Sequence, residues 1–350
     1  MIGPKYTNRR RRHRLAKKSI HHYSDNQKKI HHILEYGILA PSTHNTQPWK
    51  IKAAENNVKI FADHSKKITQ ADPTGRDLYM SLGALVKNIE LASQAYSVDY
   101  KVEPAFQITE KLPVATISFE RLPHETSKID RDLLNSIKNR QNYRGFFKSH
   151  LSKSSDVEKI ITGVSEPGAD IRLISDEKII KELAVLTAKG LRMAYASREF
   201  RREISSYINH NFSQKKHGLH GYSLRMNFPA SVIIPKIMKR KDIGERLSAL
   251  NYRSFISAPA VAVLYSKDNK EGWLGAGMLM QEVMIKLTGL GITSSIYAAA
   301  VEMGNLRTEV SQLTPPKNKN MIPQLLFCIG EPEDELPYSA RKKLNKVLTD

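Results

Sequence analysis

The sequence is poor in cysteine and in long apolar runs. Its single cysteine, Cys328, excludes a disulfide within the chain and is typical of a reducing compartment, so we expect a cytoplasmic location. Cys328 lies in the apolar run 325–329, which favours a buried strand thiol over a nucleophile. The most apolar stretch, 232–235, is far too short to span a membrane, and the basic N-terminus lacks the apolar core of a signal peptide.

Histidine and cysteine clusters with the spacing of metal ligands are also lacking. The pairs His21-His22 and His31-His32 are adjacent in the sequence, and adjacent side chains on a helix do not face each other. We therefore predict no metal site. No general base can be identified either, so we assign no catalytic residue.

Acidic residues are scarce, with 35 Asp and Glu against 55 Lys and Arg, which gives a formal net charge of +20. The excess is concentrated at the N-terminus, where residues 1–32 hold ten Lys and Arg and one acid. The densest cluster, Arg9–Arg14, has the charge to contact nucleic acid, an anionic membrane or an acidic partner. A solvated, flexible arm over residues 1–26 explains it more simply, so we do not expect nucleic-acid binding.

The 350 residues, with 40% hydrophobic and 26% charged, are typical of a globular chain with a large core. Ile30, Ile33, Leu34, Gly37 and Ile38 have the spacing of one buried helix face, and Pro41 ends that helix. An extended stretch, 49–53, follows Pro48 and forms a predicted hairpin with 58–62. Further helices are expected over 130–146, 155–164 and 177–208, and strands over 114–119, 171–174 and 259–265.

Two long helices dominate the rest of the pattern. The first begins at Gly75-Arg76-Asp77 and ends near Tyr96, and the second covers 275–290 and is apolar nearly all round, hence central. Aligning Gly83 with Gly277 superposes them, and a helix–turn–strand unit precedes each, at 30–53 and 157–174. The chain therefore resembles a diverged internal duplication.

We predict an α+β fold of two related modules, in which mixed or antiparallel sheets are packed by helices around the central long helices. The first module is expected at 27–125 and the second at 126–350. Residues 209–241 mix glycine, proline, aromatic and basic residues without a steady period, and they suggest a mobile lid.

The loop Ala40–Lys50 holds small polar side chains between two prolines. Composition alone favours an ordinary helix–strand turn. The order A-P-S-T-H-N-T-Q-P-W, however, closely resembles the signature A-P-S-[ST]-x-N-x-Q-P-W of the FMN-dependent nitroreductase superfamily. This resemblance implies a flavin at the helix–strand junction.

Other stretches resemble the Acg-like branch of that superfamily, in which one duplicated chain holds both halves of a flavin site that ordinary nitroreductases build across a homodimer. The resemblance implies a monomer that acts as an intramolecular pseudo-dimer. In order, the stretches are 72–76, 82–84, 139–144, 268–277, 301–302, 323–326, 329–330 and 339–344.

The resemblance also implies the cofactor-binding residues. From the first module they are Pro41, Ser42, Thr43 and Asn45, which would line the flavin. From the second they are Arg140, Asn142 and Arg144, near the phosphate, ribityl chain or pyrimidine edge; Ala300, Val301 and Glu302, whose backbone would pass the reactive edge; and Arg341 and Lys342, which would hold the phosphate. Two positions depart from the family: alanines at 298–300 where it usually has a proline, and Asn142 in place of serine or threonine.

For function, the resemblance implies a ping-pong oxidoreductase. NAD(P)H would be the transient donor of a hydride to flavin N5, and a small quinone or nitroaromatic would be the acceptor. Arg144 would stabilise the anionic reduced flavin. The alternative is an FMN-sequestering protein, in which the lid 209–241 closes over the ring and excludes the nicotinamide.

Overall fold

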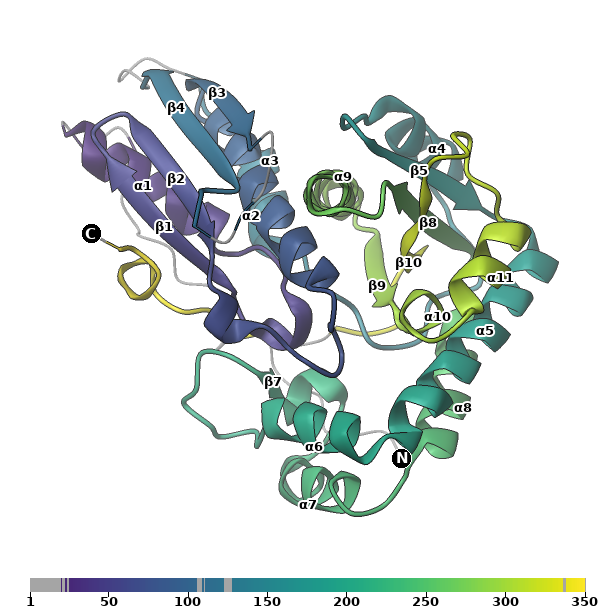
Figure 1. Cartoon of the computed structure of the whole chain (residues 1–350). Helices are drawn as coiled ribbons and strands as arrows, with labels where there is room; N and C mark the ends of the chain where they lie inside the picture. The colour runs from purple at the N-terminus through teal and green to yellow at the C-terminus, as the bar shows by residue number, and fades with distance from the viewer. Residues whose placement is uncertain are drawn as a thin grey trace.

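Two antiparallel sheets flank a pair of long helices in the computed structural model (Figure 1). The structure describes residues 20, 23, 25–105, 109, 111–122, 128–335 and 338–349. Most of the predicted basic arm, including Arg9–Arg14, lies outside these residues. The long helices are α2 (Arg76–Ala95) and α9 (Lys270–Gly289), and α9 begins five residues earlier than the sequence pattern suggested.

The two sheets have the same connectivity. The first contains β1 (Trp49–Ala54), β2 (Asn57–Ala62), β3 (Asp99–Pro104) and β4 (Ala115–Arg121) in the order β1-β2-β4-β3. The second contains β5 (Ala169–Ile174), β8 (Ala260–Ser266), β9 (Thr293–Tyr297) and β10 (Ile322–Gly330) in the order β5-β8-β10-β9. In each, the long helix connects the second and third strands. The predicted α+β architecture is confirmed, the shared order is consistent with duplication, and the boundaries at 27, 125 and 126 stay predictions.

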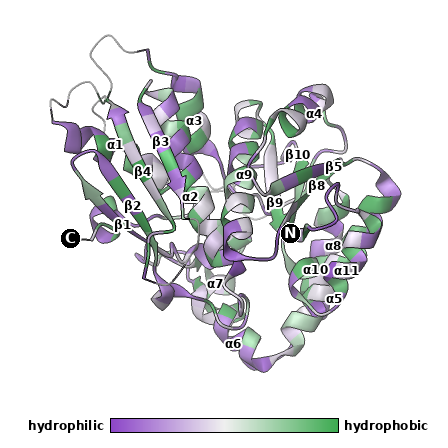
Figure 2. Ribbon diagram, turned by 45° about the horizontal axis from the view of Figure 1, so that its top comes forward, coloured by the Kyte–Doolittle hydropathy of each residue, from purple (hydrophilic) through white to green (hydrophobic). Residues whose placement is uncertain are grey.

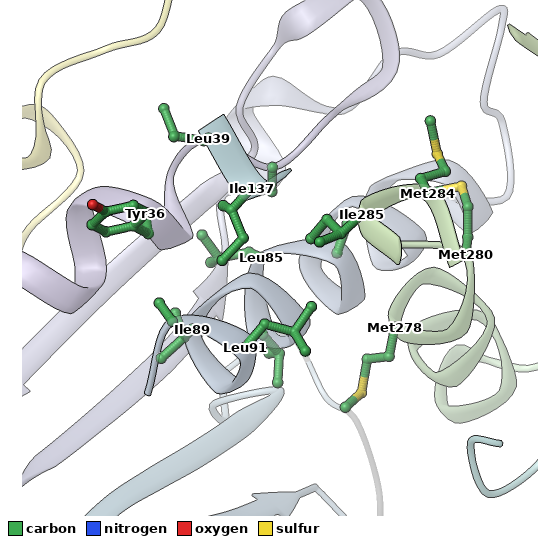
Figure 3. Close-up of a cluster of buried hydrophobic side chains, with 14 of the residues drawn as sticks. Tyr36, Leu39, Leu85, Ile89, Leu91, Ile137, Met278, Met280, Met284 and Ile285 are labelled. Carbon is green, nitrogen blue, oxygen red and sulfur yellow. The ribbon is translucent and has the colours of Figure 1, made fainter. Parts of the chain in front are cut away.

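The long helices cross at a pair of glycines. A Cβ atom on Gly83 would lie 2.0 Å from the carbonyl oxygen of Leu274, and one on Gly277 would lie 2.0 Å from that of Met80. The backbones can therefore approach this closely only where both helices lack a side chain. Figure 3 shows the apolar cluster around this contact, with Leu85 of α2 and Ile285 of α9.

The second sheet separates two cores. Ala262 and Leu264 of β8 belong to the cluster around α2 and α9, whereas Val261 and Val263 belong to a second cluster with α5 (Glu177–Ala196). Every residue of β8 is buried, as its apolar sequence predicts for a strand covered on both faces. Cys328 of β10 is buried in the second cluster, as expected.

The other helices differ from the sequence pattern mainly in where they end. α1 (Asn26–Gly37) and α4 (Ser154–Gly163) match it closely. α3 (Arg131–Asn139), on which hydrophilic and hydrophobic residues alternate in Figure 2, ends seven residues before position 146. It ends there because the chain then pairs with β9, where the Tyr143 N–H donates to the Ser294 carbonyl at 2.8 Å.

The region after α5 is more regular than expected. The predicted helix 177–208 is divided into α5 and α6 (Arg198–Tyr207), because Ser197 caps α6 by accepting from the Phe200 N–H at 3.2 Å. The lid segment, residues 209–241, contains most of the short pair β6 (Ile208–Asn209) and β7 (Leu219–His220), and also α7 (Phe228–Met238). Asn227 caps α7, a helix that the sequence pattern did not indicate. α8 (Gly244–Ile256), α10 (Ala299–Glu302) and α11 (Leu306–Leu313) complete the helices that the site requires.

The C-terminal segment returns to the first module. The Ile51 N–H donates to the Val347 carbonyl and the Thr349 N–H donates to the Ile51 carbonyl, both at 2.8 Å. Residues 338–349 therefore run from the second sheet to the edge strand β1. This path carries Arg341 past the loop at the end of α1.

Candidate functional site

A cavity of about 360 Å³ lies between the two modules. This volume is in the range of small-molecule sites. The loop after α1, the stretch after α3, the central helices, the lid segment and the C-terminal segment all contribute to its wall. Of the predicted cofactor-binding residues, those lining it are Pro41, Ser42, Thr43, Asn45, Arg140, Asn142, Arg144, Glu302 and Arg341.

The loop after α1 has an unusual backbone. His44, Asn45 and Gln47 have φ angles of 49°, 55° and 53°, in the left-handed region that non-glycine residues seldom occupy. Hydrogen bonds within the loop hold this conformation: the Gln47 N–H donates to Ser42 Oγ at 2.9 Å, and Thr46 Oγ1 donates to the Thr43 carbonyl at 3.0 Å. The loop is therefore a preformed part of the wall.

The amides of this loop tie it to two distant segments. Asn45 Nδ2 donates to the Gly218 carbonyl at 3.2 Å and to the Ala340 carbonyl at 3.0 Å, so both of its hydrogens are directed at protein. Gln47, which is fully buried, donates to the Lys216 carbonyl at 2.7 Å and accepts from the Lys342 N–H at 2.8 Å. Asn45 lines the cavity, but its amide hydrogens position the lid segment and the C-terminal segment.

Arg140, which is buried, and Arg341, which is partly buried, donate to one carbonyl group. Arg140 Nη2 and Arg341 Nη2 donate to the Leu39 oxygen at 3.3 and 3.2 Å, and Arg341 Nη1 donates to Asn45 Oδ1 at 3.0 Å. Arg144 also lines the cavity. Within the described part of the chain, no carboxylate lies at ion-pair distance from these three arginines. The part of the cavity wall that these arginines form is therefore positively charged.

Burial weakens the charge of these arginines without removing it at neutral pH. It lowers the pKa of Arg140 to about 9, with the charge of Arg341 as a second cause, and it lowers the pKa of Arg341 to about 10. Nε and Nη1 of Arg140 and Nε of Arg341 are buried and have no hydrogen-bond partner among the residues described. Unpaired buried donors are costly, and an anion with several oxygens would satisfy them. The donor set fits a phosphate group.

A second charged cluster borders the same cavity. Arg76 Nη2 lies 3.2 Å from Asp77 Oδ1 and 3.1 Å from Glu302 Oε1, and Thr43 Oγ1 donates to Asp77 Oδ2 at 2.9 Å. Burial, and then the charge of Asp77, raise the pKa of Glu302 to about 8. The same two causes, in the same order, raise the pKa of Asp72 to about 6. Both carboxyl groups therefore bind a proton more readily than exposed ones do.

Three predicted cofactor-binding residues do not line the cavity. The side chains of Ala300 and Val301 are packed in the second core, and the Val301 carbonyl accepts from Arg76 Nη1 at 3.3 Å and Arg307 Nε at 2.8 Å. Lys342 Nζ donates to the carbonyls of Thr46 and Gln47 at 3.3 and 3.4 Å. The Lys342 ammonium group is therefore bound to the loop after α1. This corrects the prediction that Lys342 holds a phosphate in the cavity.

Asn142 has one part of its amide engaged. Its Oδ1 accepts from the Ile296 N–H at 2.8 Å, which fixes the stretch after α3 against β9. The same pairing positions Arg140 and Arg144 on either side of it. His44 also faces the cavity, and burial lowers its pKa to about 4, so its ring is neutral at physiological pH.

Sequence reasoning missed much of the apolar wall. Met80 and Met280 come from the crossing helices, and Ala298 and Ala299 come from the start of α10. Their sequence pattern indicates core and nothing more, because a buried apolar side chain looks the same beside a cavity as inside a core. Aromatic and polar lining residues missed in the same way are Tyr195, Phe200, Tyr297, Tyr338, Thr187 and Ser81.

The chain was compared with known proteins. A family model described as "Putative TM nitroreductase" matches residues 2–75, which include the whole loop after α1. Two proteins of Mycobacterium tuberculosis are similar along the chain. "Putative NAD(P)H nitroreductase Rv3131" is 22% identical over 321 residues, 90% of both chains. "Putative NAD(P)H nitroreductase acg" is 23% identical over 332 residues, 91% of this chain and 95% of that one. The predicted resemblance to the Acg-like nitroreductases is confirmed.

Among solved structures, the FMN-dependent nitroreductase NfnB from Mycobacterium smegmatis in complex with NADPH is 16% identical, with a TM-score of 0.41. The alignment covers 63% of this chain and 98% of that one. A TM-score this low adds no independent support to the sequence relationship.

Proposed function

From its resemblance to the nitroreductases along nine-tenths of its length, we propose that this chain binds FMN in the cavity between its modules and reduces a small acceptor with NAD(P)H. The observation that carries the proposal is the pair of guanidinium groups at the Leu39 carbonyl. Arg140 is buried and Arg341 is partly buried, both keep unpartnered donors, and neither has a carboxylate at ion-pair distance among the residues that the structure describes. That arrangement suits the phosphate of a mononucleotide.

The remaining lining residues suit the rest of such a ligand. Arg140 and Arg341 would hold the phosphate, and Arg144 would place positive charge beside the ring. Pro41 and Ala299 would border its flat faces or edges. When bound, FMN supplies the hydride chemistry, in two half-reactions that link NAD(P)H to a quinone or nitroaromatic acceptor.

The residues of the chain would then bind and orient FMN and exclude water from the cavity. The cationic Arg144 favours negative charge that develops in the cavity. Glu302, whose pKa is raised by burial, would be the lining carboxyl group that takes up a proton most readily. Because both halves of the site belong to one polypeptide, we also propose that the protein acts as a monomer, which light scattering tests.

The storage alternative depends on the lid segment. Leu219, Ser223 and Leu224 of this segment line the cavity, so it is well placed to cover a ligand. The relatives above are nevertheless named as NAD(P)H nitroreductases, and nothing in their names supports storage. We therefore retain the reductase as the proposed function.

The test is the visible spectrum of the purified full chain, recorded with added FMN and then after anaerobic addition of NADPH. We expect one FMN per chain and rapid bleaching of the yellow colour, followed by reoxidation on addition of a quinone. Failure to bind FMN would overturn the proposal. Bound flavin that stays yellow with both NADH and NADPH would overturn the reductase function and support storage.

A matched pair of variants locates the site. Arg341→Gln removes a donor from the cavity, whereas Arg246→Gln removes an exposed arginine of α8. We expect FMN affinity to fall about 100-fold in the first variant, as for loss of a charged hydrogen bond, and to stay unchanged in the second. Equal affinity in both variants would place the flavin elsewhere.

A further inference from the structure

The lid segment, residues 209–241, has a one-sided charge. It contains seven Lys and Arg and no Asp or Glu. Four of these cations lie close together at the end of α7 and just after it, at Lys236, Lys239, Arg240 and Lys241, and all four are exposed. Figure 1 shows α6 and α7 at the bottom of the molecule, away from both sheets. Because the lid segment lies at one end of the molecule and carries only positive charge, it will be attracted to a negatively charged surface.

The same segment exposes large apolar side chains. The exposed fractions are 66% for Phe212, 44% for Phe228, 53% for Ile233 and 41% for Ile237. Ile233 and Ile237 are four residues apart and so share one face of α7. The rings of Phe212 and Phe228 are in contact, with centroids 4.8 Å apart, and they form a second exposed apolar group at the start of α7.

We propose that this outer lid surface, formed by Phe212, Phe228, Ile233, Ile237 and the four exposed cations, docks on an anionic lipid bilayer. Apolar side chains of an interfacial helix enter the boundary between headgroups and acyl chains, while lysines extend to the phosphates. No helix in the described ranges is long and apolar enough to cross a membrane, so the docking is peripheral.

The pattern fits a lipid surface better than an acidic protein. The core of a protein–protein interface is depleted of lysine, whereas here the exposed Lys236 directly precedes the exposed Ile237. Exposed apolar residues next to a cluster of four cations, without acids in the segment, are instead typical of surfaces that bind anionic lipid.

Docking would bring the cavity wall to the membrane. Leu219, Ser223 and Leu224 line the cavity, and they belong to the same segment as the outer lid surface. The bilayer would thus contact the part of the chain that covers the cavity. The docking proposal does not rest on FMN or on the reductase activity, because its residues lie outside the cavity wall.

The test is sedimentation of the full chain with lipid vesicles. One set is phosphatidylcholine alone, and the other contains about 30% phosphatidylglycerol, an anionic lipid. We expect binding to the second set and not to the first, with weaker binding as salt is added. Failure to sediment with anionic vesicles would overturn the proposal.

A matched pair of double variants separates docking from simple charge attraction. Ile233→Glu with Ile237→Glu changes the outer lid surface, whereas Val185→Glu with Leu250→Glu makes the same charge change at side chains that are 52% and 51% exposed. We expect the first pair to lower vesicle binding about tenfold more than the second, because apolar burial is lost as well. Equal losses would overturn the proposal.

Binding to an acidic polypeptide, and not to lipid, is a separate possible outcome of these experiments. If the wild-type chain ignores anionic vesicles but binds immobilised polyglutamate through residues 233 and 237, the surface recognises acidic polypeptide and the lipid proposal is wrong. Thermal unfolding of all variants shows whether each is folded. Because all four positions are exposed, we expect similar Tm values.

Discussion

The guanidinium groups of Arg140 and Arg341 donate to the same oxygen, the carbonyl of Leu39, at 3.3 and 3.2 Å. Arg140 directly follows α3, and Arg341 lies in the C-terminal segment. Like charges repel, and burial intensifies the repulsion. Without a ligand the pair opposes folding, and with an anion between the side chains it favours the ligand.

Removal of one arginine should therefore have opposite effects on stability and binding. In Arg140→Gln we expect the free energy of unfolding without ligand to stay the same or to rise by about 1 kcal/mol, because a buried unpaired charge is lost. We also expect inorganic phosphate to raise the Tm of the wild-type chain and not that of the variant. A large loss of stability in Arg140→Gln, or equal stabilisation by phosphate, would contradict this account.

Glu302 should make stability depend on pH. Its pKa rises from 4.5 to about 8 on folding, so between these values the native state binds more protons than the unfolded state. The free energy of unfolding therefore falls as pH rises through this range. We expect Glu302→Gln to lose less stability than the wild-type chain between about pH 6 and pH 8.5, measured by urea unfolding. The exposed Glu120→Gln serves as the control and should follow the wild type.

The crossing of α2 and α9 should not tolerate a methyl group. In Gly83→Ala the new Cβ would meet the Leu274 carbonyl at 2.0 Å, and backbone on both helices would have to move. We expect a loss of at least about 3 kcal/mol in the free energy of unfolding. Gly163→Ala is the matched control, because a Cβ there meets nothing within 4 Å. A variant at Gly83 as stable as the control would refute the close crossing.

Gln47 should couple the loop after α1 to the lid segment. Gln47→Ala leaves the Lys216 carbonyl and the Lys342 N–H without their partner, and the site is fully buried. We expect a loss of about 2–4 kcal/mol together with faster hydrogen exchange in residues 213–219. Gln94→Ala removes an exposed hydrogen bond to Tyr100 and should cost no more than about 1 kcal/mol. Unchanged exchange in the lid segment would show that Gln47 does not hold it.

The local parts of the fold could be predicted from the sequence. Pro41 and Pro48 mark the ends of the loop after α1, and Asp72 accepts from the Leu78 N–H in the first turn of α2 at 3.0 Å. Helix α7 was missed because Pro229 and Pro235 indicate a loop. Pro229 instead fits the first turn of α7, two residues after the capping residue Asn227.

The candidate site was predictable only in part, because it is assembled from distant segments. The local sequence does not indicate that Arg140 and Arg341 lie close together. Only the family resemblance placed both at one binding site. The error at Lys342 has a local cause. Around these residues the chain is not helical, so neighbouring side chains point in different directions, and Arg341 faces the cavity while Lys342 reaches the Thr46 carbonyl.

The return of the C-terminal segment to β1 also sets the order in which the molecule can be completed. Synthesis proceeds from the N-terminus, so the loop after α1, both sheets and both crossing helices exist before Arg341 and Val347 leave the ribosome. The arginine pair at the Leu39 carbonyl is therefore the last part of the described cavity wall to be completed. A chain that stops before position 338 would keep both four-stranded sheets and both crossing helices but would lose Arg341 from the cavity wall, so we expect it to bind anions more weakly.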